Sequence, residues 1–243
     1  MEYQTAFSYK CNACGRCCHN QVITLSPYDV IRLARTANLS TGEAITRFTL
    51  RRGSLLRFEE NGCCTALERA RCTLHRGRPL ACRFYPLGFE SGSRASFVRL
   101  EPAIGSAGVY GTAGTVADFL KSQEVAPYLE AVERYRSLIP LMGARVAILA
   151  DFERTEPREF WRRAFHEAMR EANYDPNPLI NAIFDAGAAV GPYHYDSDND
   201  LIGAHLREIE ELIRRADDPA MIAAAAFLLA VSLGYEPAKV AAG

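Results

Sequence analysis

The chain has 243 residues, of which 49% are hydrophobic and 23% are charged, and its formal net charge is −1. This length and apolar content suffice for one large domain or two modest ones, and the near-neutral charge argues against a nucleic-acid partner. Residues 1–10 contain neither the basic nor the apolar region of a signal peptide, so we expect a cytoplasmic protein.

Four of the eight cysteines stand in residues 11–18, which read CNACGRCC. A Cys-x-x-Cys pair places two sulfurs around one tetrahedral cation, and soft thiolates select zinc, Cu(I) or iron–sulfur clusters. Cys11, Cys14 and Cys17 make two such steps, and Cys18 follows directly. Because adjacent residues do not easily face one tetrahedral centre, we expect Cys17 and Cys18 to face different metals, unless one bridges or stays free. The spacing therefore favours a polynuclear site over a lone zinc ion.

Local patterns after this cluster predict two helices and a hairpin. Ser26 followed by Pro27 is typical of a helix start, and a second helix is predicted from residue 40 or 41 to about residue 48. Residues 54–59 predict a strand that leads into a hairpin turn at Asn61-Gly62.

The other four cysteines are Cys63, Cys64, Cys72 and Cys82, and none follows. The two clusters therefore indicate one site built from two pieces of chain. A disulfide scaffold is disfavoured, because four of the thiols are too close together to join distant loops. Five arginines interleave with the cysteines and could neutralise an anionic thiolate centre, although surface arginine is common in this chain: Arg16, Arg71, Arg76, Arg78 and Arg83.

The rest of the chain is predicted to be mainly helical. Residues 89–100 predict a hairpin with 91–93 at its tip, and residues 105–114 predict a Gly-rich structural loop, after which Thr115 caps a helix. Helices are then predicted over 127–139, 155–169, 178–186, 201–216 and 221–234, and the last is too short to span a membrane. We predict a mostly α protein without a membrane partner. Its small Cys-rich α+β metal-binding part, residues 1–111, packs against a C-terminal helical bundle, residues 112–243.

The cysteine motifs carry a resemblance to a known family. The pattern C-x-x-C-x-x-C-C, then G-x-C-x-x-L, then C-x-[IL]-[YH]-x-x-R-P-x-x-C-R-x-[FY]-P resembles a cysteine-cluster family described as a zinc- or iron-chelating domain, which includes flagellin lysine-N-methylases. The match covers roughly residues 8–112. The resemblance implies seven metal ligands: Cys11, Cys14, Cys17, Cys18, Cys64, Cys72 and Cys82.

Several neighbouring residues stay open as ligands. Cys64 takes the Gly-x-Cys position of the family pattern, so Cys63 is the one cysteine of this chain that the pattern does not include. Many relatives carry a further Cys-Pro-Gly-Ile-Gly segment, where this chain has Glu101 and no thiol, and we expect Glu101 to be solvated and the site to be one ligand short. His19 and His75 are the only histidines near the thiols.

Three functions fit these observations. The first is a protein that holds an iron–sulfur cluster or iron in a polynuclear centre and acts as an oxidoreductase or redox carrier. The second is a structural zinc module whose helical half binds a protein partner, since no catalytic Ser/His/Asp set stands outside the cluster. The third is a protein-lysine methyltransferase, which only the resemblance implies. We favour the first, keep zinc as the alternative metal, and leave enzymatic activity open.

Overall fold

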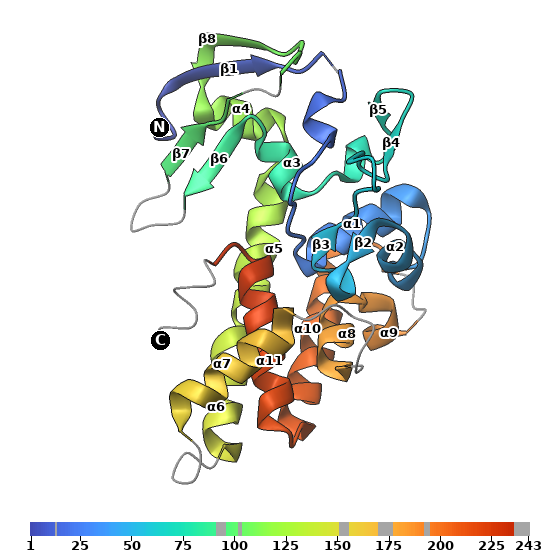
Figure 1. Cartoon of the computed structure of the whole chain (residues 1–243), viewed down its shortest axis with the longest axis vertical. Coiled ribbons are helices and arrows are strands. Elements are labelled where there is room, and N and C mark those ends of the chain that lie inside the picture. The colour runs from blue at the N-terminus through green and yellow to red at the C-terminus, as the bar shows by residue number, and fades with distance from the viewer. Residues whose placement is uncertain are drawn as a thin grey trace.

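The computed structural model describes residues 1–12, 14–90, 96–101, 104–150, 156–169, 177–191 and 195–235. In these residues the protein is mostly α-helical, with a small strand-containing N-terminal region and a helical C-terminal half, as the sequence predicts (Figure 1). Most strands lie at one end of the molecule, β2 and β3 lie near its middle beside α1 and α2, and α6 and α7 lie at the other end. The part of the chain that the structure describes contains no helix with the length and apolar character that a membrane span requires.

The described strands form four separate antiparallel pairs, β1 with β8, β2 with β3, β4 with β5 and β6 with β7. The predicted turn at Asn61-Gly62 is present, because Phe58 and Cys64 form an antiparallel bridge across it and Gly62 has a φ of 79°. Of the strand predicted over 54–59, only Leu55–Leu56 joins a ladder. The strand bounds are β1 Ala6–Lys10, β2 Thr49–Leu50, β3 Leu55–Leu56, β4 Leu67–Glu68, β5 Arg71–Cys72, β6 Leu87–Glu90, β7 Ser96–Arg99 and β8 Val109–Thr115.

The prediction of a structural loop over 105–114 is wrong for its second part, which forms strand β8 and pairs with β1. Strand β1 approaches this segment so closely that two positions require glycine. A Cβ on Gly108, just before β8, would overlap the Tyr9 hydroxyl group, and a Cβ on Gly111 would lie 2.8 Å from the Ser8 hydroxyl oxygen. The domain boundary predicted at residue 111 falls inside this strand. The hairpin predicted over 89–100 corresponds to β6 and β7, and its tip, residues 91–93, lies outside the described residues.

The helix starts follow the predicted capping residues. Ser26, Ser40 and Thr115 each accept a hydrogen bond from the backbone N–H three residues on, which completes a capping box at α1, α2 and α4. The bounds are α1 Pro27–Ala37, α2 Thr41–Phe48, α3 Leu80–Phe84, α4 Val116–Ser122, α5 Ala126–Arg136, α6 Leu138–Leu149, α7 Pro157–Met169, α8 Pro178–Phe184, α9 Ala186–Val190, α10 Asp198–Arg215 and α11 Pro219–Ser232. Residue 155, at which the helix predicted over 155–169 begins, lies outside the described residues.

The single helix predicted over 127–139 is wrong, because the structure divides this region into α5 and α6 at Ser137. Pro140 explains the division: it has no N–H to donate to the carbonyl of Arg136, and its ring crowds that carbonyl. The second helix then continues to Leu149, well beyond the predicted end.

Three hydrophobic cores hold these elements together, and α1 contributes to two of them. Its Ile31 packs into the large core of the helical half, while its Leu33 packs into the core beneath the cysteines. A third core lies between β1, β6, β7 and α4. Asp198 at the start of α10 accepts hydrogen bonds of 2.7 Å from the Tyr28 hydroxyl group and from Arg32, which ties α1 to the helical half.

His205 of α10 is fully buried in the helical half. Its Nε2 lies 2.6 Å from the carbonyl oxygen of Ala182, and its Nδ1 lies 2.7 Å from the Tyr135 hydroxyl oxygen. Because a carbonyl oxygen can only accept, Nε2 carries the proton of the neutral ring and Nδ1 accepts from Tyr135. Burial lowers the pKa of His205 from 6.5 to about 4.

We predict that His205 makes the fold acid-sensitive. The unfolded chain takes up a proton at this histidine below pH 6.5, whereas the folded chain does so only near pH 4, so stability is full above pH 6.5 and falls as the pH drops through this window. The loss should reach about 3 kcal/mol near pH 4. In chemical unfolding at a series of pH values, His205→Gln should flatten this dependence, while the matched change His166→Gln at an exposed position should leave it intact. An unchanged pH dependence in His205→Gln would contradict the prediction.

Candidate metal centre

A single cavity of about 890 Å³ collects the thiols of both cysteine clusters. All eight cysteines have free thiols. Cys63 is not among the residues that line the cavity, and neither are His19 and Glu101. The lining cysteines are the seven that the resemblance implies as ligands: Cys11, Cys14, Cys17, Cys18, Cys64, Cys72 and Cys82.

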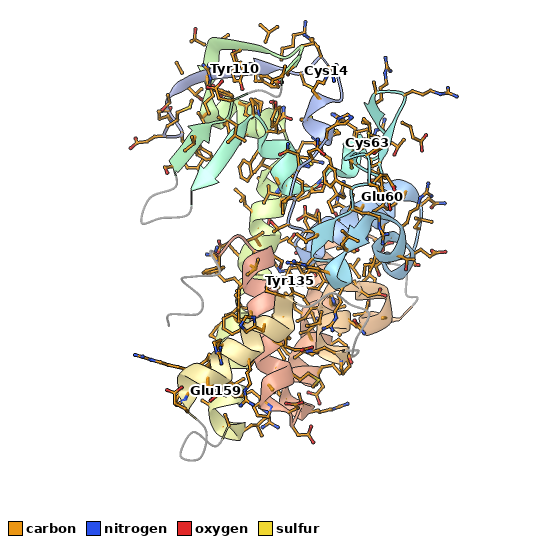
Figure 2. All side chains as sticks on the ribbon, in the orientation of Figure 1. Cys14, Glu60, Cys63, Tyr110, Tyr135 and Glu159 are labelled. Carbon is orange, nitrogen blue, oxygen red and sulfur yellow. The ribbon has the colours of Figure 1, made fainter. Side chains whose placement is uncertain are left out.

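Cys11 and Cys14 of the first cluster lie between β1 and a short 3₁₀ helix, η1, Arg16–Cys18, and Cys17 and Cys18 are part of η1; Cys14 is labelled in Figure 2. Gly15 caps η1 with a φ of 70°, a left-handed conformation that suits glycine. The segment before β8 holds this loop in place, because the backbone N–H of Ala107 donates to the Cys14 sulfur at 3.5 Å and the Asn12 amide donates to the carbonyl oxygen of Ala107 at 2.5 Å.

Backbone pairing then joins the two clusters. The N–H of Cys64 donates to the carbonyl oxygen of Cys18 at 2.8 Å, and His19 and Cys63 form an antiparallel bridge. Successive side chains of extended chain point to opposite faces. This alternation accounts for the difference between the two adjacent thiols: Cys64 is buried against the cavity, and Cys63, labelled in Figure 2, lies outside its lining.

The last two lining cysteines are positioned against α1. The hairpin of β4 and β5 carries Cys72, and a short 3₁₀ helix, η3, His75–Gly77, then packs so closely on α1 that a Cβ on Gly77 would lie 2.3 Å from the carbonyl oxygen of Arg32. Helix α3 carries Cys82. Its first N–H, that of Leu80, donates at 2.8 Å to the buried carboxylate of Asp29, which also accepts from the N–H and the hydroxyl group of Ser26.

The thiols differ in how readily they lose a proton. Burial raises the pKa of Cys64, Cys72 and Cys82. The Cys18 thiol donates to the Cys17 sulfur, which lowers the pKa of Cys17 to about 7 and raises that of Cys18. The thiols of Cys18, Cys64, Cys72 and Cys82 are therefore protonated at neutral pH without a cation, whereas Cys17 loses its proton near neutral pH. Metal binding at the protonated thiols would release protons.

Two of the five arginines near the cysteines are withdrawn from solvent and have different surroundings. Arg83 is only 2% exposed, donates to the carbonyl oxygens of Arg76, Arg78 and Gln123, and lies 4.6 Å over the Tyr128 ring. Arg78 lines the cavity and donates to two uncharged acceptors, the carbonyl oxygen of His75 and Oε1 of Gln123, each at 2.7 Å. Its charge lowers the pKa of Cys17. Arg78 therefore faces the thiols, whereas Arg83 organises the surrounding backbone.

The histidines and Glu101 have different positions around the cavity. His75 lines it, and burial lowers the pKa of this ring, so the neutral form that can bind a metal is favoured. His19 instead has its Nδ1 3.0 Å from the carbonyl oxygen of Gly15. Glu101 is exposed, and the two residues after it lie outside the described residues.

The donor set suits a soft metal, although the sulfurs surround the cavity and do not meet at one point. Among the described residues, no three His, Cys, Asp or Glu side chains are close enough to hold one ion. Cys17 and Cys18 have sulfurs 3.9 Å apart, near the roughly 3.8 Å that Zn–S bonds of about 2.3 Å imply for two thiolates on a tetrahedral zinc. Adjacency alone therefore does not force these two thiols onto separate metals. Seven lining thiols nevertheless exceed the four that one tetrahedral ion binds.

These features define the N-terminal region as a cysteine-cluster metal-binding domain. Residues 10–103 match the model of the CxxCxxCC family, whose description reads "Putative zinc- or iron-chelating domain", and this confirms the resemblance seen in the sequence. The match contains every cysteine and covers less than half of the chain. No curated protein and no solved structure is significantly similar to this chain.

Sequence reasoning missed the part that Asp29 plays at this site. Asp29 stands in the first turn of α1 and forms the capping box with Ser26. Nothing in a single sequence pairs it with the N–H of Leu80, which is distant in the chain. The only local signal is that Asp29 lies two residues after Pro27, at the position of a capping box.

We predict that Asp29→Asn destabilises the fold by about 2 kcal/mol, because a buried hydrogen-bonded carboxylate is lost and one of its donors is left without a charged acceptor. Asp118→Asn is the matched control. Asp118 has the same capping-box role in α4 but is exposed and bonds only to Thr115. Urea unfolding of both variants measures the difference, and equal losses would show that the bond to Leu80 contributes nothing.

Proposed function

We propose that the chain holds a polynuclear metal centre, an iron–sulfur cluster in the first place, at the thiol-lined cavity, with Cys11, Cys14, Cys17, Cys18, Cys64, Cys72 and Cys82 as its ligands. The observation that carries the proposal is that the seven implied ligands line one cavity and the eighth thiol, Cys63, does not. Such a centre would supply electron transfer or Lewis-acid chemistry when bound. The chain's own residues would hold it, shield it from water and balance its charge.

The charge of the surroundings supports an anionic centre. Arg78 and Arg83 are both withdrawn from solvent, and their hydrogen bonds go mainly to uncharged oxygens. The carboxylates near them are the buried Asp29 and the exposed Glu124, whose oxygen lies 3.5 Å from Arg83. A guanidinium group that is partly buried without a carboxylate partner is costly unless an anion lies nearby. Arg78 has no carboxylate among its hydrogen-bond acceptors, and a metal cluster held by several thiolates would supply the missing negative charge.

A structural zinc centre is the second candidate, and the 3.9 Å separation of the Cys17 and Cys18 sulfurs favours it. In that case the helical half would act by binding a protein partner. The two candidates differ in metal content and in colour. If the chain holds an iron–sulfur cluster, protein purified anaerobically should be brown, absorb near 400 nm and contain iron and acid-labile sulfide. A colourless protein with stoichiometric zinc would instead support the structural zinc centre.

We predict that Cys64→Ser loses most of the bound metal and that the adjacent change Cys63→Ser retains it. The two residues are neighbours in sequence, so the pair controls for the local effect of a serine. Cys14→Ser and Cys82→Ser should resemble Cys64→Ser and should also lower the melting temperature, because a metal bound only by the folded state stabilises it. The measurement is elemental analysis of each purified variant, and equal metal loss from Cys63→Ser would contradict the ligand assignment.

We also predict that Arg78→Gln weakens metal retention about tenfold, since one positive charge beside the thiolates is removed and a charge-assisted interaction is worth about 1.4 kcal/mol. Competition with a chelator measures this effect. Arg76→Gln is the control, because Arg76 is exposed and does not line the cavity. Equal retention in the wild type and Arg78→Gln would show that Arg78 does not balance the charge of the centre.

A further inference from the structure

The charged residues of this chain are unevenly distributed. Residues 10–103 contain 15 Lys and Arg but only 7 Asp and Glu, whereas the remaining residues contain 13 Lys and Arg and 22 Asp and Glu. The imbalance is greatest around the thiols. Residues 3–28 and 69–89 carry six of the eight cysteines, and they contain seven Lys and Arg and no Asp or Glu. The chain is therefore basic around its cysteines, although its total charge is close to zero.

Five of these basic side chains are exposed and border the thiol-lined cavity. Arg71 lines the cavity itself, and each of the other four is next in the chain to a residue that lines it. The loop of the first cluster also touches the tip of the β4–β5 hairpin, because a Cβ on Gly15 would lie 3.2 Å from the carbonyl oxygen of Ala70. The five residues, called the basic rim below, are Lys10, Arg16, Arg69, Arg71 and Arg76.

The basic rim lacks counter-charges of its own. Within the ranges that the structure describes, no ion pair joins a rim side chain to a carboxylate. Glu68 stands opposite Arg71 in the β4–β5 pair, yet these two side chains form no ion pair either. Neighbouring like charges repel one another, and an anionic partner relieves that repulsion. The planar guanidinium group of arginine suits carboxylates, because it can donate to both oxygens at once.

We propose that the basic rim binds an acidic segment of a partner protein, a short run of Asp and Glu side chains, beside the thiol-lined cavity. The acidic excess outside residues 10–103 favours a protein over a nucleic acid. An extended polyanion that reached beyond the rim would be repelled by that excess, whereas a short acidic segment is attracted by the rim alone. The rim uses no thiol, so this proposal and the proposed metal centre can fail separately.

Fluorescence anisotropy of a dye-labelled peptide of alternating Glu and Gly residues, titrated with the full chain, tests the proposal. The peptide should bind saturably and lose affinity as salt is added, because salt screens exposed charges. Peptides with Gln or Lys in place of Glu should not bind. No binding of the Glu peptide at low ionic strength would overturn the proposal. Tighter binding of a single-stranded oligonucleotide of equal charge would overturn the choice of a protein as partner.

Two triple variants locate the binding site. The rim variant combines Arg16→Gln, Arg69→Gln and Arg76→Gln, which are exposed positions outside the cavity lining. It should weaken binding of the Glu peptide about tenfold, roughly the combined effect of three surface charge pairs.

The control variant removes the same charge from exposed positions of α7, at the other end of the molecule (Figure 1). It combines Arg158→Gln, Arg162→Gln and Arg163→Gln. This variant should keep most of the affinity of the wild type. Equal weakening in both triple variants would show that net charge attracts the peptide and would overturn the assignment to the rim, and so would unchanged affinity in the rim variant. Melting temperatures report whether both variants fold.

The metal content of each sample is measured in parallel. Binding of the Glu peptide by a protein that never contains metal would refute the metal centre and leave the basic rim standing. A metal-containing protein that does not bind the peptide would do the reverse.

Discussion

The buried carboxylate of Asp29 fixes the relation between the cysteines and the rest of the molecule. Helix α1 belongs to the helical core through Ile31 and to the core beneath the cysteines through Leu33. Asp29 stands in the first turn of this helix and accepts the first N–H of α3. Burial raises the pKa of Asp29, and the hydrogen bonds it accepts and the charge of Arg83 oppose that rise. Cys82 is thereby placed relative to the helical half as well as to the other thiols.

The cavity exists because the three hydrophobic cores meet without merging. Leu33, Phe84 and Val132 belong to different cores, and each also lines the cavity. On the side of the first cluster the wall consists of cysteines, which behave as small apolar side chains when they are protonated. Raised pKa values for Cys64 and Cys72 keep them in that form. The same cysteines can therefore pack as apolar side chains when no metal is bound and coordinate a metal ion when it binds. Metal binding and local packing are thereby coupled.

Patterns that depend on neighbouring residues could be predicted from the sequence, and contacts between distant segments could not. The caps at Ser26, Ser40 and Thr115 are local, and so is the Asn61-Gly62 turn. Strand β8 was missed because glycine is a poor strand former, and its partner β1 lies about a hundred residues earlier in the chain. The motif could separate Cys64 from Cys63, but the reason, backbone pairing with Cys18, is visible only in the structure.

The arginines of the second motif show why composition alone is a poor guide to electrostatics. Sequence reasoning treated five arginines as equal candidates for neutralising the thiolates, yet only Arg71 and Arg78 line the cavity. Arg83 instead joins η3, the start of α3 and the end of α4 through three carbonyl oxygens. A lysine could not replace it there, because a single ammonium group lacks the planar fork that reaches several acceptors at once. Arginines therefore accompany the cysteines of this motif for two reasons: Arg71 and Arg78 line the cavity that holds the thiols, and Arg83 organises the backbone that carries them.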